Sequence, residues 1–176
     1  MLTVHLIDAL DAEILLTLDR DPQGTVLSLS RSLGVARNTV RARLRRLLTD
    51  GSLAPFSQRV RTEALGLPLT AFISISISQS SSEEATAALR TLPEIIEMHA
   101  TTGDADLLAK VAARDPADLH RVTNSMLAIA GVVRTSTAMS LVEVMPARTA
   151  ALMHAAAAGR RSGPGMTDGK GNIFSQ

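Results

Sequence analysis

The sequence predicts an α+β protein in which an N-terminal winged helix-turn-helix is joined to a C-terminal βαββαβ domain of ferredoxin-like topology. The main reason is a change of period. Apolar residues recur at helical spacing in the first third of the chain, whereas the following part alternates strand-like and helix-like segments. The charge also divides unevenly between these parts. We expect a helix-turn-helix in residues 1–51, a wing and linker in 52–66, the βαββαβ domain in 67–146, and an Ala-rich helix with a disordered tail in 147–176.

The composition excludes several classes of protein. Of the 176 residues, 45% are hydrophobic, which is enough for packed cores. The chain has no cysteine, so disulfides, thiolate metal sites and thiol nucleophiles are excluded. No apolar stretch reaches the roughly 18 residues of a membrane helix, and residues 1–11 have no Lys or Arg and do not resemble a signal peptide. We therefore expect a cytoplasmic protein without a membrane partner.

The charge of the chain is nearly balanced overall but not locally. The formal net charge of +1 divides into +3 for residues 1–62, −5 for residues 63–146 and +3 for residues 147–176. One segment of 16 residues contains six arginines and no acid: Arg31, Arg37, Arg41, Arg43, Arg45 and Arg46. Such a segment indicates an anionic partner, although a solvated helix face would have the same composition.

Three helices are predicted in the first part. Asp8 and Asp11 form a capping-box pattern, with one carboxylate at the N-cap and another at the third helical position. Thr25 can cap a second helix, and Gly34 can end it in the left-handed conformation that glycine adopts readily. Apolar spacing then sets the bounds of the helices, which are about Ala9–Leu18, Val26–Leu33 and Arg37–Thr49.

The second and third helices, joined by a short turn with a glycine, form a helix-turn-helix. The N-terminal half of a recognition helix reaches base edges, where Arg can pair with guanine and Asn with adenine. Thr39 suits a phosphate or a thymine methyl group, and Arg43 and Arg46 lie toward the flanks, where phosphate contacts are expected. The predicted partner is double-stranded DNA, and the alternative is a purely structural helical cap. The candidate DNA contacts are Arg37, Asn38, Thr39, Arg41, Arg43 and Arg45.

Residues 53–61 are too polar and too short for another helix. They suit a wing or hairpin that leads into the linker. Arg59 and Arg61 within it could contact phosphate or could simply be exposed linker charges.

The second part is predicted to form four strands and two helices. Phe72–Ser78 alternates apolar and polar residues, as a half-buried strand does. Asp115 and Pro116 are suited to the N-cap and first position of a helix that ends at Gly131. A two-layer domain of this kind leaves one sheet face open, so we expect two copies to pair through their sheets. The remaining predicted elements are a helix over Glu83–Thr91 capped by Ser82 and strands over Ile95–Thr101, Leu107–Ala113 and Val132–Met145.

An ordered set of motifs extends over residues 7–146. The motifs are Ile7-Asp8-x-x-Asp11-x-x-Ile14-Leu15, Leu33-Gly34-Val35, Thr39-Val40-Arg41-Ala42-Arg43-Leu44-Arg45-Arg46-Leu47, Asp50-Gly51, Thr102-Gly103-Asp104-Ala105-Asp106-Leu107-Leu108-Ala109-Lys110 and Gly131-Val132-Val133-Arg134-Thr135-Ser136-Thr137. This set resembles the leucine-responsive regulatory protein/AsnC family of bacterial and archaeal transcriptional regulators. The resemblance implies a RAM-type βαββαβ domain that senses an amino acid. It also implies no cofactor, and homodimers that assemble into tetramers or octamers.

The resemblance also implies an effector site between dimers, beside the Gly-Asp-x-Asp loop. Backbone N–H groups at Gly103 could bind the carboxylate of an amino acid, and Asp104 or Asp106 its ammonium group. Alternatively, the loop is only a hairpin turn that Asp106 caps. Family members often have an aromatic residue at position 105, and Ala105 here implies room for a larger or aromatic effector. The candidate effector residues are Thr102, Gly103, Asp104, Ala105, Asp106, Thr135, Thr137 and Ala138.

The remaining expectations concern other functions and the two ends of the chain. The histidines are not spaced as metal ligands, so no metal site is expected. An enzyme is the alternative class, because relatives of this fold in tetrapyrrole metabolism are decarboxylases; an architectural DNA-binding protein without an effector is the third. Ala36 stands where the family usually has a capping Ser, so the third helix should lack a side-chain cap. A helix over Ala147–Arg161 could pack on a neighbouring subunit.

Overall fold

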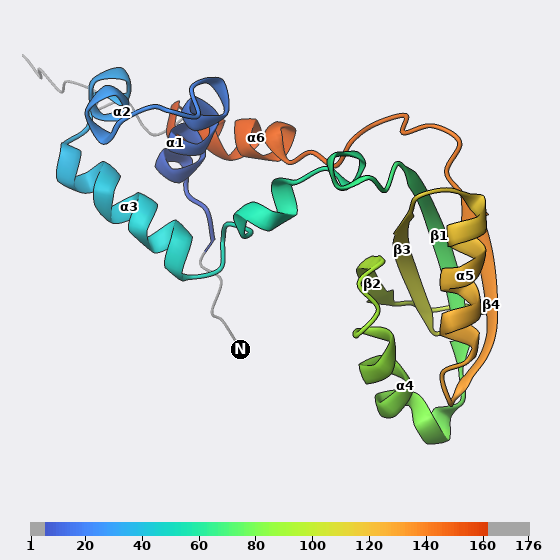
Figure 1. Cartoon of the computed structure of the whole chain (residues 1–176). Coiled ribbons are helices and arrows are strands. Elements are labelled where there is room, and N and C mark those ends of the chain that lie inside the picture. Colours follow the sequence, from blue (N-terminus) through green and yellow to red (C-terminus); the bar gives the residue numbers. More distant parts are fainter. Residues whose placement is uncertain (1–5, 162–176) are drawn as a thin grey trace, which may run out of the picture. The chain divides into compact units, whose positions relative to one another are not determined.

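The computed structural model describes residues 6–161, which form two compact units (Figure 1). A helical unit consists of the chain up to Ala54 together with the chain from Pro146 onward, and a sheet domain consists of Pro55–Met145. The predicted disordered tail, residues 162–176, lies outside the described residues.

The helical unit begins with three helices, α1 (Ala9–Arg20), α2 (Val26–Leu33) and α3 (Arg37–Thr49). Their predicted caps are present. The Asp8 carboxylate accepts a hydrogen bond from Asp11 N at 3.0 Å, and the Asp11 carboxylate accepts one from Asp8 N at 3.1 Å. Thr25 Oγ1 accepts from Ser28 N, and Gly34 ends α2 with a left-handed φ of +66°. Local capping chemistry therefore sets the start of α1 and both ends of α2.

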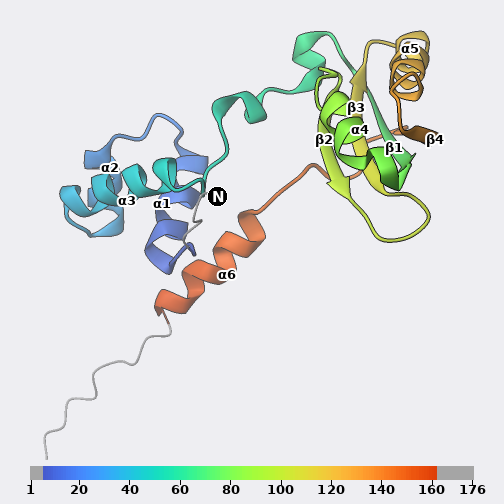
Figure 2. The same cartoon turned by 90° about the horizontal axis from the view of Figure 1, so that it is seen from below.

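The core of this unit is small and apolar. Ile14, Leu29, Val40 and Leu47 are fully buried, one or two from each of the three helices. A fourth helix, α6 (Ala150–Arg161), lies beside α1, as both views in Figures 1 and 2 show. The predicted Ala-rich helix is thus present but begins later than expected, and in this structure it packs on α1 of its own chain.

The segment expected to form a wing or hairpin instead forms two short 3-10 helices, η1 (Phe56–Arg59) and η2 (Thr62–Leu65). Their bonds are local: Gln58 N donates to Pro55 O, and Ala64 N donates to Arg61 O. The expectation of a hairpin is therefore wrong for residues 53–61. A hairpin would need two segments that pair with each other, and Pro55 starts a tight turn instead.

The sheet domain has the predicted βαββαβ order. Its elements are β1 (Leu69–Ile77), η3 (Gln79–Ser81), α4 (Ser82–Leu89), β2 (Ile95–Ala100), β3 (Leu107–Ala113), α5 (Pro116–Leu127) and β4 (Val132–Met139). The four strands are antiparallel in the order β2-β3-β1-β4. Ile73 and Ile75 of β1 are fully buried against Leu89 of α4 and Val122 and Met126 of α5, in one continuous core. The other face of the sheet, which includes Phe72, is not covered by a helix of this core.

Several element bounds differ from the sequence expectation; α1, for example, continues to Arg20, two residues beyond the predicted Leu18. β4 ends at Met139, not at Met145, because β1 starts at Leu69 and offers no further partner after Ser140 N bonds Thr70 O. The first helical residue of α4 is Ser82, so the N-cap is Ser81, and its side chain makes no capping hydrogen bond. The first strand begins at Leu69, three residues before the predicted Phe72, and β2 ends one residue early, whereas β3 has the predicted bounds. The Asp115–Pro116 start of α5 is found where expected, with Asp115 accepting from Asp118 N.

Candidate nucleic-acid interface and effector groove

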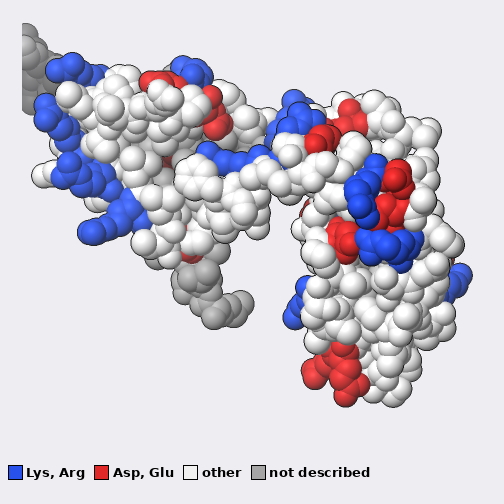
Figure 3. Space-filling view, viewed as in Figure 1, with Lys and Arg blue, Asp and Glu red and all other residues white. Residues whose placement is uncertain are grey.

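The outer face of α3 carries the predicted DNA-contacting side chains. Arg37, Asn38, Thr39, Arg41 and Arg45 are all exposed. They are exposed because Val40 and Leu47 on the opposite face are buried against α1 and α2. Figure 3 shows Lys and Arg side chains gathered along this edge of the helical unit. The structure thus presents three arginines and an amide on one helix face, with the Thr39 hydroxyl exposed in the first turn, and these groups suit base edges and phosphates.

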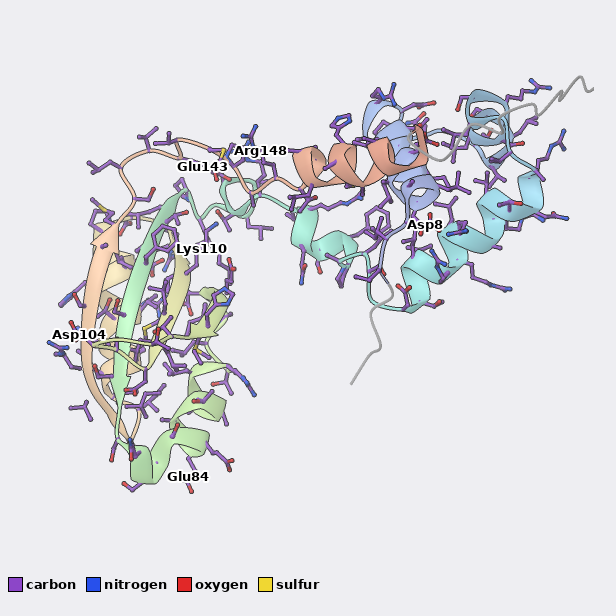
Figure 4. All side chains as sticks on the ribbon, turned by 180° about the vertical axis from the view of Figure 1, so that it is seen from behind. Asp8, Glu84, Asp104, Lys110, Glu143 and Arg148 are labelled. Carbon is purple, nitrogen blue, oxygen red and sulfur yellow. The ribbon has the colours of Figure 1, made fainter. Side chains whose placement is uncertain are left out.

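Arg43, the sixth predicted contact, has a different environment. Its guanidinium forms ion pairs with Asp8 and Asp11 of α1, and Arg46 pairs with the same Asp11. Asp11 is fully buried, whereas Asp8, labelled in Figure 4, is half-exposed at the start of α1. The hydrogen bond to Asp8 raises the pKa of Arg43. Burial raises the pKa of Asp8, but the hydrogen bond from Asp11 N and the Arg43 guanidinium outweigh it, and the pKa lies below its usual value. These four residues, which we call the acid–arginine clamp, join α1 to α3.

The start of α3 also matches a sequence expectation. Ala36 occupies the N-cap and makes no side-chain capping bond. No side chain therefore caps the first turn of α3, which is the positive end of the helix dipole; Thr39 N donates to Ala36 O at 3.0 Å.

The loop between β2 and β3 contains five of the predicted effector residues. Thr102, Gly103 and Asp104 are exposed at its tip, and Gly103 has a φ of +119°. Figure 4 shows the labelled Asp104 on the sheet domain, at this loop. Asp106 N donates to Ile75 O at 3.0 Å, and its carboxylate accepts from Ile77 N at 2.7 Å. The Asp106 carboxylate thus adds one more hydrogen bond to β1 beyond the last β1–β3 pair. This is the turn-capping role that the sequence offers as the alternative to effector binding.

A groove of about 480 Å³ lies next to Asp106, between α4 and the edge strand β2. Its α4 wall consists of Ser82, Thr86 and Arg90, and its apolar lining includes Ile95, Ile96, Met98 and Leu107. Asp106 is the one predicted effector residue that lines it. The other residues that line the groove were not predicted from the sequence. The signal was available, because positions 82, 86 and 90 fall on one face of the helix predicted there.

The predicted effector residues of β4 do not join this groove. Thr135 and Thr137 pair with Ile75 and Ile73, so they share the helix-covered side of the sheet. Ala138 pairs with Phe72 and shares the open side. Within one chain the eight predicted residues are therefore divided between the loop and two faces of the sheet.

Residues 6–161 contain neither a metal-binding cluster nor a membrane-spanning helix. No group of three or more His, Asp or Glu side chains there is arranged to hold a metal ion. None of the helices in that part of the chain has the length and apolar character needed to cross a membrane.

Comparison with known proteins identifies both units. The family model "AsnC-type helix-turn-helix domain" matches residues 7–48, and the model "Lrp/AsnC ligand binding domain" matches residues 70–150. The chain is 31% identical over 136 residues to the HTH-type transcriptional regulator FL11 of Pyrococcus furiosus, a match that covers 77% of this chain and 90% of FL11.

Solved structures agree with this result. Escherichia coli AsnC superposes with a TM-score of 0.75 at 27% identity, covering 83% of this chain and 99% of AsnC. A transcriptional regulator of Neisseria meningitidis, solved as a complex with L-Met, superposes with a TM-score of 0.69 at 26% identity, covering 80% and 94% of the two chains. Because these relatives are transcriptional regulators, the enzyme interpretation is set aside. The protein is a DNA-binding transcriptional regulator that belongs to the Lrp/AsnC family.

Proposed function

We propose that this regulator reads a specific DNA sequence in the cytoplasm with the exposed N-terminal half of α3. Arg37, Asn38 and Arg41 are assigned to base edges, and Thr39 and Arg45 to phosphates. The observation that carries the proposal is that Arg37, Asn38, Arg41 and Arg45 share one exposed face of a helix whose other face is buried. Thr39 is exposed in the first turn of the same helix. The start of α3 supports it, since it has no side-chain cap and a DNA phosphate can accept from backbone N–H groups at a helix N-terminus.

Arg43 was predicted to contact phosphate, but a contact with DNA would compete with its ion pairs to Asp8 and Asp11. We therefore assign Arg43 chiefly to positioning α3, within the acid–arginine clamp. The logarithm of the DNA-binding constant falls linearly with the logarithm of the salt concentration, and we call the steepness of this line the salt slope. Replacing a phosphate-binding arginine lowers the salt slope by about 1, whereas replacing a positioning arginine leaves it nearly unchanged and lowers the stability of the fold.

We further propose that the open sheet face joins two copies. Phe72 and Leu108 supply its apolar centre, and Phe72 remains 42% exposed in the single chain. Glu97 and Lys110 are cross-strand neighbours beside that centre. Two copies related by a two-fold axis present the same patch to each other, so each copy offers its partner both the Glu97 carboxylate, which also contacts His99 Nε2 at 2.6 Å, and the Lys110 ammonium group. Such a dimer carries two recognition helices for two DNA half-sites, and dimers then assemble into tetramers or octamers.

The proposed effector is an amino acid bound in the groove beside Asp106. The volume of about 480 Å³ falls within the range of roughly 300–1,000 Å³ that small-molecule sites have. Arg90 can bind the carboxylate and Asp106 the ammonium group, while Ile95, Ile96 and Met98 contact the side chain. The L-Met complex of the Neisseria regulator supports an amino acid as the class of ligand. The small Ala105 favours a larger or aromatic side chain, and the β4 residues Thr135, Thr137 and Ala138 would take part through a neighbouring copy.

The test is fluorescence anisotropy with DNA taken from upstream of the gene itself, with each amino acid added in turn. We expect tight binding to that fragment, weak binding to a shuffled fragment, and a change in affinity or assembly size with one amino acid. Specific binding that no amino acid alters would indicate an architectural protein without an effector. Equal affinity for the two fragments would refute sequence-specific reading.

A thermal-shift screen tests the class of effector. Stabilisation by large or aromatic amino acids, lost in Arg90→Ala, is expected. If only small aliphatic amino acids stabilise the protein, the inference from Ala105 is wrong.

A further inference from the structure

The C-terminal helix α6 completes the helical unit. Ala157 of α6 is buried against Ala12 and Leu16 of α1, and Met153 and Ala156 pack at the margin of the same cluster. Most of these side chains are small, so the two helix backbones can approach closely. Without α6, Ala12 and Leu16 would lie on the surface, although they are now 0% and 7% exposed.

Helix α6 lies beyond the two modules that define the family. The matched ranges are residues 7–48 and 70–150, and α6 begins at the last matched residue. The α1 surface that α6 covers is within the first range. This chain therefore places a segment of its own on a surface of the family's DNA-binding module.

The opposite side of α1 is held by the recognition helix. Asp11, next to Ala12 in the sequence, pairs with Arg43 and Arg46 of α3. Helix α1 is thus fixed on one side by α6 and on the other by the acid–arginine clamp. A displacement of α6 would act on α1, and α1 holds the helix that we propose to read DNA.

The polypeptide chain itself connects α6 to the sheet domain. β4 ends at Met139, and residues 140–149 lead directly from it to α6. The helical unit is therefore joined covalently to the sheet domain twice: through η1 and η2 after α3, and through residues 140–149 before α6, which packs on α1. The proposed effector groove is connected to β4 through the sheet. Asp106, which lines the groove, is hydrogen-bonded to Ile75 and Ile77 of β1, and β1 pairs with β4.

We propose that α6 is a coupling clamp, which docks on α1 of the same chain and transmits effector-dependent changes at β4 to the recognition helix. The inference rests on the proposed function, because it requires a DNA-binding response to an effector. The competing occupant of the α1 surface is α6 of a second copy, exchanged between protomers.

The first test disrupts the contact with one charge. Ala157→Asp places a carboxylate in the apolar cluster, and the matched control Ala155→Asp places it on the exposed side of the same helix. We expect Ala157→Asp to lower the melting temperature of the helical unit by about 4–8 °C or more, and Ala155→Asp to leave it nearly unchanged. Equal melting temperatures for the two variants would overturn the docking of α6.

The second test separates coupling from binding. In Ala157→Asp we expect the amino acid that stabilises the wild-type protein in the thermal-shift screen still to bind the sheet domain. The change in DNA affinity that this amino acid induces should fall at least threefold. A response equal to that of the wild-type protein would overturn the coupling role. If the wild-type protein itself shows no effector response, the proposed function fails instead, so the two failures are distinguishable.

The third test assigns the occupant. The chain has no cysteine, so Leu16→Cys with Ala157→Cys creates a unique thiol pair within the cluster. Oxidation should give a disulfide within one chain, seen as monomer mobility on a non-reducing gel and as an intrachain linked peptide. A covalent dimer would show exchange between protomers and overturn docking on the same chain.

Discussion

The acid–arginine clamp offers the sharpest test of how α3 is held. Asp11→Asn keeps the shape of the side chain and leaves an oxygen that can still accept from Asp8 N. It removes the negative charge that Arg43 and Arg46 share. Asp11 is fully buried, so water cannot replace that charge. Both arginines would then be left partly buried beside a neutral amide.

The size of the effect follows from burial. Removing one partner of a buried ion pair costs about 3–5 kcal/mol. The side chains of Arg43 and Arg46 remain 28% and 36% exposed, and Asp8 still pairs with Arg43, so the lower end, about 3 kcal/mol, is expected. For a unit of this size that loss lowers the melting temperature by about 12 °C or more.

The assay is thermal and urea unfolding followed by far-UV circular dichroism, because the chain has no Trp or Tyr for fluorescence. Hydrogen exchange of peptides from α1 and α3 assigns the loss to the helical unit. The matched control is Asp19→Asn, an exposed carboxylate on the same helix, which should change stability by less than about 0.5 kcal/mol. If Asp11→Asn is as mild as Asp19→Asn, the ion pairs do not hold α3 in place.

Three further predictions concern binding and stability. Gly131→Ala should destabilise the sheet domain by about 2 kcal/mol or more in urea unfolding, because its φ is +91° and a Cβ would lie 2.7 Å from Ser81 Cβ. The control Gly66→Ala, at a φ of +78° with open space around it, should lower the free energy of unfolding by less. Hydrogen bonds from Arg114 hold the pKa of Asp118 well below its usual value. This carboxylate therefore stabilises the fold above about pH 4, and its contribution is lost as the pH falls. The urea midpoint of Asp118→Asn, measured from about pH 7 down to about pH 2, should fall less with pH than that of the wild-type protein. Arg43→Ala should lower the melting temperature of the helical unit while changing the salt slope of DNA binding by well under 1; a drop of about 1 at unchanged stability would show a phosphate contact instead.

Local signals account for what could be predicted from the sequence. The bounds of α2 were found because Thr25 and Gly34 cap and end it by chemistry within a few residues, and those of α3 were found from its apolar spacing. The strand at Leu107–Ala113 was likewise found in full. Alternation of buried and exposed residues correctly placed Ile73 and Ile75 on the core face.

Features that depend on a distant partner were not predictable in this way. Arg43 and Arg46 have the same composition as the DNA-facing arginines, and only their approach to Asp11, some 30 residues earlier, gives them another role. The predicted β4 was too long because apolar residues continue in the sequence after Met139. The pairing of β4 with β1, however, ends at Met139. The effector groove needed α4 and β2 to be placed side by side before Arg90 and Asp106 could be seen to share it.

DNA reading by the exposed face of α3 is tested most directly by the ratio of affinities for the upstream fragment and for its shuffled control. Arg41→Ala should weaken specific binding by about 1–3 kcal/mol and reduce this ratio, because a base contact is lost while phosphate contacts remain. Arg20→Ala is the control, since Arg20 lies on α1 and its Nε donates to Leu16 O in its own helix. An unchanged ratio in both Arg41→Ala and Arg37→Ala, with the fold intact, would contradict the assignment of α3 as the recognition helix.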